Sequence, residues 1–163
     1  MRFKALLLSR VAGGLLALVL SLAADAAPIL PGGVLPALAL EDQHGRTVST
    51  SANTRLVLFA ADKAASDLIN EVLAARPAGV LEGLGAVYFA DISAMPALVT
   101  RMFALPALRE MPFAVGLGRE AGQLADLPRQ KGAATVVRLV DGKVASIEYA
   151  RNVGQLMQAI GLK

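Results

Sequence analysis

The chain of 163 residues contains no cysteine, a single histidine and only 4% aromatic residues. Without a thiol there is no thiolate nucleophile, so disulfide exchange and thiol-dependent peroxide reduction are excluded. Disulfides cannot constrain the unfolded chain, and lipid attachment to a cysteine is excluded as well. The fold must therefore be held together by burial, and its chemistry must proceed without sulfur nucleophiles.

The net positive charge is also small outside the N-terminal segment. Arg2, Lys4, Arg10 and Asp25 all lie before residue 27, so the net charge falls from +3 for the whole chain to +1 for residues 27–163. The remaining Lys and Arg residues form no cluster that could follow a phosphate backbone, and aromatic residues are few. We therefore expect no nucleic-acid binding.

The N-terminus has the pattern of a secretory signal. Arg2 and Lys4 precede an apolar run, Val11 to Ala23, which is followed by small residues at the positions that a signal peptidase reads. This pattern predicts cleavage after Ala26 and a periplasmic location. Arg10 shortens the apolar stretch below the ~20 residues that span a bilayer, so we expect no transmembrane helix after cleavage. An uncleaved membrane anchor is the alternative.

Removal of residues 1–26 leaves 137 residues, which suits one domain with a substantial core. Residues 27–36 mix proline and glycine without a sustained period. They predict a leader that lies along the surface. The domain proper is expected to comprise residues 37–163.

The first half of the domain alternates strands and helices. Residues 37–48 predict a hairpin around a polar turn, and the apolar run 55–60 predicts a central strand covered on both faces. A helix ending near Pro77 is expected next. Its apolar residues share one face: Ala65, Leu68, Ile69, Val72 and Leu73.

A second strand is expected at 86–90, with another helix after it. Ser93 is a candidate cap for that helix, and Pro106 should limit its length. Its apolar residues share one face: Met95, Leu98, Val99, Met102 and Phe103. We interpret the methionines as core-filling residues.

The C-terminal part carries the clearest local signal. After a third strand at 113–117 and a short helix or turn at 120–127, residues 135–148 predict a hairpin around Asp141-Gly142. Asn152 is expected to cap a final helix that stops at Gly161. The whole pattern predicts an α/β fold with a mixed central sheet and helices on both faces.

From about Leu35 to Leu162 the chain resembles the thioredoxin-like superfamily, especially its peroxiredoxin-like exported members. The resemblance implies a three-layer sandwich with helices on both faces of the sheet, and the order of elements matches over nearly the whole domain. The matching stretches are Leu38–Arg46, Leu56–Phe59, Met111–Phe113, Gly132–Val137 and Asp141–Val144.

Two departures from the family pattern bear on function. Active members carry cysteine at the start of the first long helix, where the helix dipole lowers the thiol pKa, whereas here the window 60–65 has none. A cis-proline of the family is replaced by Ala134, so we expect a trans peptide and a reshaped loop. The resemblance thus implies a silent redox site, without catalytic residues, metal or cofactor, at Ala61, Asp62, Lys63, Ala64 and Ala134.

The remaining polar candidates have simpler interpretations. His44 lies near Glu41 and Asp42, but one imidazole in a turn with flexible carboxylates is typical of a solvated residue rather than a metal site or general base. Asp62 is expected to cap the helix, with Lys63 solvated. Ser66 has no histidine predicted nearby to activate it.

Three hypotheses follow. The leading one is a periplasmic, redox-inactive domain that binds a protein partner, an extended peptide or a small ligand at the former thiol site. The second is an enzyme that uses non-thiol groups near Asp62, Lys63 and His44. The third is an accessory subunit whose leader, residues 27–36, docks on a larger envelope complex.

Overall fold

The computed structural model describes residues 28–162, so the predicted signal segment lies outside the described residues. The elements of the described chain are β1 (Ala39–Glu41), β2 (Thr47–Ser49), β3 (Leu56–Ala60), α1 (Lys63–Ala74), α2 (Val80–Leu84), β4 (Ala86–Asp91), α3 (Ala97–Val99), the π-helical η1 (Thr100–Ala104), α4 (Leu105–Arg109), β5 (Gly116–Gly118), β6 (Ala134–Val140), β7 (Lys143–Ala150) and α5 (Val153–Ile160).

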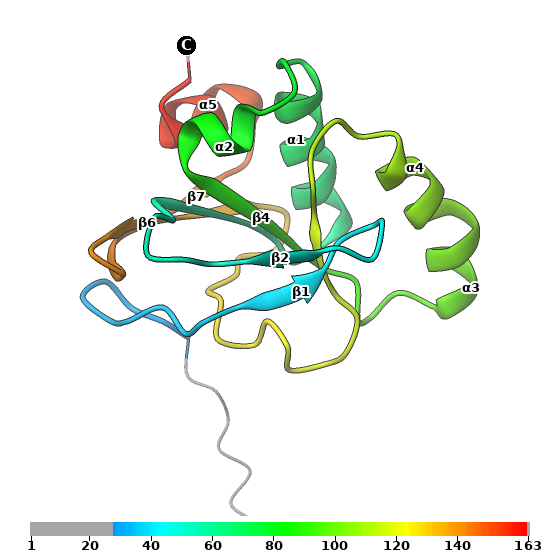
Figure 1. Cartoon of the computed structure of the whole chain (residues 1–163), viewed down its shortest axis with the longest axis horizontal. Helices are drawn as coiled ribbons and strands as arrows, with labels where there is room; N and C mark the ends of the chain where they lie inside the picture. The colour runs from blue at the N-terminus through cyan, green and yellow to red at the C-terminus, as the bar shows by residue number, and fades with distance from the viewer. Residues whose placement is uncertain (1–27, 163) are drawn as a thin grey trace, which may run out of the picture.

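A five-stranded mixed sheet forms the centre of the domain, with strand order β5-β4-β3-β6-β7 (Figure 1). Strands β3, β4 and β5 are parallel, and β6 is antiparallel to both β3 and β7. Strand β3 is buried along its whole length, as its continuous apolar sequence predicts. The predicted N-terminal hairpin forms a separate two-stranded sheet, β1-β2.

Helices cover one face of the sheet. Helices α1 and α5 pack there side by side (Figure 1), and their buried side chains join those of β3, β4 and β6 in one apolar cluster that includes Leu58, Ile69 and Leu156. The residues that the sequence predicts on the inner face of α1 are those that point into this cluster. This packing fixes the start of α1 at the carboxyl end of β3.

Among residues 28–162, the opposite face of the sheet is covered by strands, turns and loops and by no helix. Its apolar cluster contains Phe59 and Phe89 from the sheet, Leu38 and Val48 from the hairpin region, and Leu124 from the 119–133 segment. That segment forms turns, because the Gln123 side chain accepts hydrogen bonds from nearby backbone N–H groups and a glycine at 122 has a positive φ of 98°. The fold class is confirmed, and of the short helix or turn predicted at 120–127, the turn is what forms.

The C-terminal elements agree with the sequence in detail. Asp141 and Gly142, with φ of 51° and 74°, connect β6 and β7 in the tight turn that Asp-Gly favours. The Asn152 side chain accepts a hydrogen bond from the Gln155 N–H and caps α5. Gly161, with φ of 75°, ends that helix.

The prediction for the helix after β4 is wrong in two respects. Ser93 does not cap it: the Ser93 hydroxyl donates to Asp91 Oδ1, and helical structure begins at Ala97. Pro106 does not end it either, because a π-helical turn over 100–104 precedes α4 and places the proline in its first turn, where no N–H is needed. We call residues 97–109 the broken helix.

The broken helix also leaves its apolar residues at the surface. Leu98, Val99, Met102 and Phe103 are 41–67% exposed, so the interpretation of Met102 as a core residue is wrong. Its contact with the core comes from the other side, through Leu105 and Leu108. The shared apolar face predicted from the sequence exists but is not covered within the described chain.

Candidate functional site

Asp62 organises the start of α1. Its backbone is extended, with φ −153° and ψ 173°, and its Oδ1 accepts a hydrogen bond of 2.9 Å from the Ala65 N–H. The predicted cap is therefore confirmed. Its second oxygen, Oδ2, accepts a hydrogen bond of 2.7 Å from the Gly132 N–H. One carboxylate thus joins the helix to the loop that leads into β6.

The surroundings of Asp62 keep it ionised. The hydrogen bond from the Gly132 N–H is the main reason that the pKa of Asp62 lies below its ordinary value of 3.8. Burial acts in the opposite direction, and the N–H groups at the helix start add to the lowering. Both carboxylate oxygens are therefore engaged in holding the fold, which leaves little capacity for proton transfer at neutral pH.

The five residues predicted for the degenerate site differ in accessibility. Lys63 and Ala64 are exposed, while Ala61 and Asp62 are half-buried. Ala134 is completely buried, pairs with Ala150 across β6 and β7, and supports the site from within rather than at its surface. Residues 28–162 contain no cis peptide bond, so the Ala134 peptide is trans.

Charges near the start of α1 and the end of β4 are paired. The Lys63 ammonium contacts the Asp67 carboxylate one helical turn away, and both groups are exposed. Arg129 forms an ion pair of 2.9 Å with Asp91 at the end of β4. Burial of Asp91 opposes ionisation, but the Ser93 hydroxyl and the Arg129 guanidinium outweigh it, so the pKa of Asp91 lies below its ordinary value.

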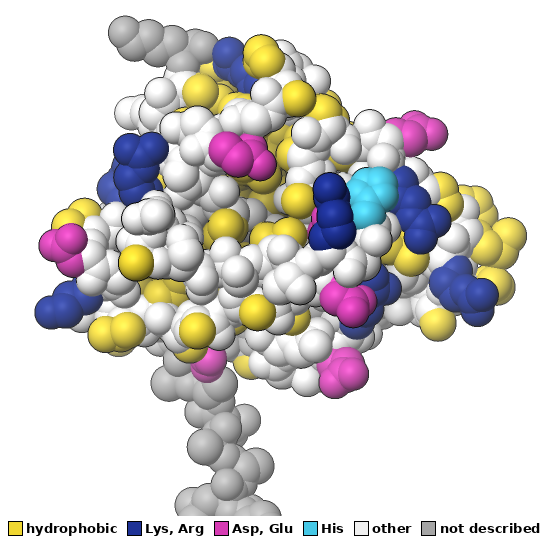
Figure 2. Space-filling view, in the orientation of Figure 1, with side chains coloured by type: hydrophobic (Ala, Val, Ile, Leu, Met, Phe, Trp, Pro, Cys, Tyr) yellow, Lys and Arg dark blue, Asp and Glu magenta, His cyan; other side chains and the backbone are white. Residues whose placement is uncertain are grey.

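A cavity of about 310 Å³ lies between α1 and the broken helix. Residues from α1, from the ends of β3 and β4 and from the broken helix line it: Ala60, Asp62, Lys63, Ser66, Asp67, Asn70, Ala90, Asp91, Ile92, Met95, Val99, Phe103, Ala104, Ala107 and Leu108. Figure 2 shows apolar side chains gathered over the region of α3 and α4. The hollow is therefore mainly apolar, with a polar side on α1.

Ser66 and Asn70 form part of that polar side. Ser66 Oγ lies 3.2 Å from the hydroxyl of Tyr88, and Asn70 Nδ2 donates to Ser66 Oγ at 3.4 Å. Burial raises the pKa of the Tyr88 phenol, so Tyr88 stays protonated. This group therefore lacks a base that could activate the Ser66 hydroxyl.

His44 lies in a different hollow from Asp62 and Lys63. It is exposed and borders a second, more open depression together with Arg46 and Glu82. Its N–H donates to Asp42, which also accepts hydrogen bonds from Arg46. Burial opposes ionisation of Asp42, but the hydrogen bonds from the backbone and the guanidinium lower its pKa below the ordinary value. The structure thus does not bring together the three residues of the enzyme hypothesis.

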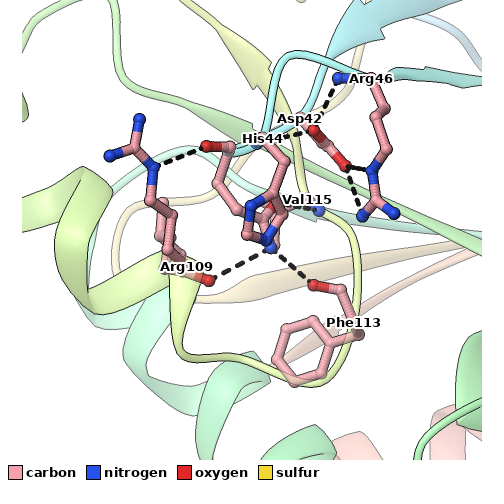
Figure 3. A network of polar contacts seen from close by, with 8 residues as sticks. Asp42, His44, Arg46, Arg109, Phe113 and Val115 are labelled. Carbon is pink, nitrogen blue, oxygen red and sulfur yellow. Dashed lines mark hydrogen bonds and ion pairs between the residues drawn. The ribbon is translucent and has the colours of Figure 1, made fainter.

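Gln43, beside His44, is a buried structural residue that the sequence does not indicate. Figure 3 shows the network around it, with its neighbours Arg109, Phe113 and Val115 labelled. Its side-chain amide nitrogen, Nε2, donates to the carbonyl oxygens of Leu108 and Phe113. Its amide oxygen, Oε1, accepts from the Val115 N–H. Its own carbonyl oxygen accepts from Arg109. The hairpin thereby fastens the end of the broken helix to the body of the domain.

Two further features of residues 28–162 concern the class of site. The described residues include no group of three or more His, Cys, Asp or Glu side chains arranged to hold a metal ion. In this same part of the chain, no helix has the length and apolar character needed to cross a membrane. What these residues do form is an apolar hollow beside a capped helix start.

Comparison with known proteins identifies the fold of this chain. No family model matches the chain, and no curated protein matches it. Among solved structures, a peroxiredoxin-like protein from Aquifex aeolicus aligns with a TM-score of 0.52 and 11% identity, covering 83% of this chain and 89% of its own. The thioredoxin domain of a thiol-disulfide oxidoreductase from Bacteroides vulgatus aligns at 0.52 and 13%, covering 81% and 99%.

The peroxidoxin BcpB from Mycobacterium tuberculosis gives a TM-score of 0.51 at 14% identity, covering 82% of this chain and 95% of its own. Such likenesses establish the fold, which agrees with the strand order and the mixed sheet. The protein is therefore a domain of thioredoxin-like fold. Its sequence contains no cysteine, so the domain cannot carry out thiol chemistry.

Proposed function

We propose that the protein is an exported, redox-inactive thioredoxin-like domain that binds a protein or peptide partner in the periplasm. The partner would contact the surface at the start of α1, formed by Ala61, Asp62, Lys63 and Ala64 and backed by Ala134. The signal segment 1–26 would be removed on export, leaving a leader at 27–36 and the domain at 37–163.

The observation that carries this proposal is the state of the former thiol position. The window 60–65, where the resemblance implies the thiols, contains alanines and no cysteine. The carboxylate of Asp62 in this window uses both oxygens to fix the helix and the loop before β6. The framework is thus kept in place while the reactive group is absent. A rigid, accessible surface of this kind supports recognition rather than turnover.

Site-specific photo-crosslinking in intact cells tests the proposal. A photoreactive residue at Ala64, which is exposed at the site, should give a reproducible adduct with a periplasmic protein. The same residue at Ala121, exposed on a turn of the opposite face, is the matched control. Adducts that are absent, or identical from both positions, would contradict the proposal, as would peroxidase or reductase activity in the purified protein.

A second candidate is an accessory subunit that docks through the leader. Leu30 and Val34 favour it, because these apolar side chains are 69% and 70% exposed and are therefore available to a partner. The double variant Leu30→Ser/Val34→Ser should then lose co-purification with the envelope complex while keeping its fold. Unchanged co-purification would exclude docking through these side chains.

A further inference from the structure

The cavity beside α1 adjoins the proposed partner site and shares part of its border with it. Of the five residues predicted for that site, only Asp62 and Lys63 border the cavity. Its volume of about 310 Å³ lies at the lower end of the range for small-molecule sites, roughly 300–1,000 Å³. The cavity is therefore large enough for a small molecule.

One wall of the cavity is apolar and largely uncovered. Val99 and Phe103 of the broken helix border the cavity, yet they are 41% and 66% exposed. Ile92 and Met95 extend this wall towards the end of β4. A bound apolar molecule would remove these side chains from water, which favours binding by the hydrophobic effect.

The charged groups that border the cavity all have partners. Lys63 pairs with Asp67, and Asp91 pairs with Arg129. Asp62 accepts two backbone hydrogen bonds. A charged ligand would lose its hydration here without finding a free counter-charge. The lining therefore favours an uncharged ligand.

One polar group at the cavity is unsatisfied. Asn70 borders the hollow, and its Oδ1 is buried without a hydrogen-bond partner among the described residues. Its Nδ2 is already used by Ser66. This oxygen is closed to solvent, so a ligand reaches it only when the Asn70 amide turns towards the cavity. Since an unpaired buried acceptor is costly, a ligand hydroxyl or N–H group that meets the turned amide gains an interaction that the protein alone does not make.

The backbone of the apolar wall is irregular at the same place. Phe103 and Ala104 belong to η1, where the Leu105 N–H bonds to the carbonyl of Thr100, five residues back. Short π-helical turns of this kind often accompany functional sites. The irregular turn thus coincides with the exposed apolar wall and the unsatisfied amide.

We propose that this cavity binds a small, uncharged, mainly apolar molecule whose single hydroxyl or N–H group donates to Asn70. This inference rests on the proposed function, because both take the domain to act by binding. It adds a class of small ligand at the cavity beside the partner site. The occupant would contact both walls of the cavity, α1 and the broken helix.

Methionine-methyl NMR of the full mature chain tests this with three probes: octanol, its isomer methyl heptyl ether, and octanoate. Met95 borders the cavity and Met157 does not. Octanol should shift the Met95 methyl saturably and leave Met157 unchanged. The ether, which has no donor, should bind about three- to tenfold more weakly, and octanoate more weakly than octanol.

Two comparisons between variants of this chain complete the test. Ala107 and Ala97 are both exposed on the broken helix, but only Ala107 borders the cavity. Ala107→Phe should weaken octanol binding at least tenfold, while Ala97→Phe leaves it unchanged. Asn70→Leu, compared with the wild type, should abolish the preference for octanol over the ether.

The inference is overturned if octanol gives no saturable shift at Met95, if it shifts Met157 equally, or if octanoate binds more tightly. Equal effects of Ala107→Phe and Ala97→Phe would also overturn it. These outcomes are independent of crosslinking at Ala64, so the partner proposal and the ligand proposal can fail separately.

Discussion

Helix α1 and the broken helix face each other across the cavity, and their sequences carry the same helical spacing of apolar residues. In α1 these residues, such as Ile69 and Leu73, are completely buried between the sheet and α5. In the broken helix Leu98 and Phe103 lie mostly in water. Periodicity therefore identifies the face of a helix but not whether the fold covers it.

The ends of the two helices differ as well. Asp62 caps α1 and ties it to the β6 loop, whereas α3 has no side-chain cap and continues directly into a π-helical turn. Helix α1 is thus part of the rigid scaffold. The broken helix is held mainly by its inner side and by Gln43, which leaves its outer side free for an occupant.

The largest expected effect compares one substitution on the two helices. Leu73→Ala in α1 should lower the free energy of unfolding by about 3 kcal/mol, because it leaves a cavity in the core. Leu98→Ala in the broken helix should change it by less than about 0.5 kcal/mol. Urea denaturation of both variants measures this. Equal losses would mean that the broken helix is covered in solution.

The next effect concerns the attachment of the broken helix. Gln43→Leu removes a buried amide with three backbone partners, so it should cost about 2 kcal/mol for the groups left unpaired. Gln158→Leu, at an exposed position of α5, is the control and should cost less than about 0.5 kcal/mol. Hydrogen exchange should also accelerate at residues 108–115 in the first variant. Protection that stays at the wild-type level there would contradict this role for Gln43.

A smaller effect is expected at the cap of α1. Asp62→Ala should cost about 1 kcal/mol at neutral pH, whereas Lys63→Ala, which removes an exposed ion pair, should cost less than about 0.5 kcal/mol. Chemical denaturation measures both. If Asp62→Ala costs no more free energy of unfolding than Lys63→Ala, the Asp62 cap does not stabilise the fold.

The same cap predicts a pH dependence. The folded-state pKa of Asp62 is below 3.8, so its charge stabilises the fold above the unfolded-state pKa, and this contribution is lost as pH falls through the folded-state pKa. The stability difference between wild type and Asp62→Asn should therefore shrink below about pH 4. A difference that stays constant from pH 7 to pH 3 would show that the charge is not involved.

The smallest effect is expected at the outer side of the broken helix. Phe103→Ser should leave the thermal midpoint almost unchanged, because the ring is largely exposed. Binding of a fluorescent apolar dye should nevertheless fall, since the variant removes part of an exposed apolar surface. A clear drop in the midpoint would place the Phe103 ring in the packed interior.

Much of the fold could be predicted from local signals. Asp62 and Asn152 are side chains with a strong local preference for caps, and Asp141-Gly142 fits one kind of turn. The continuous apolar run of β3 reflects burial on both faces. In each case the physical cause lies within a few residues of the signal, so no knowledge of the rest of the chain is needed.

The features that could not be predicted depend on distant parts of the chain. Gln43 bonds to groups about 70 residues away, and nothing near it in the sequence indicates this. Ser93 is a residue type that often caps helices, but its hydroxyl donates a hydrogen bond to Asp91 instead. The cavity arises only when α1 and the broken helix are placed side by side, so the spacing of residues such as Asn70 and Phe103 gave no sign of it.

The leader has a consequence for how the isolated domain behaves. The Gly32 N–H donates to the carbonyl oxygen of Val144, and the Gly33 carbonyl oxygen accepts from the Val144 N–H, near the start of edge strand β7. A chain shortened to begin at residue 37 would leave those backbone groups of Val144 open, and open strand edges template the association of further chains. Residues 28–36 thus cover the start of this edge, and their removal should favour association of chains there.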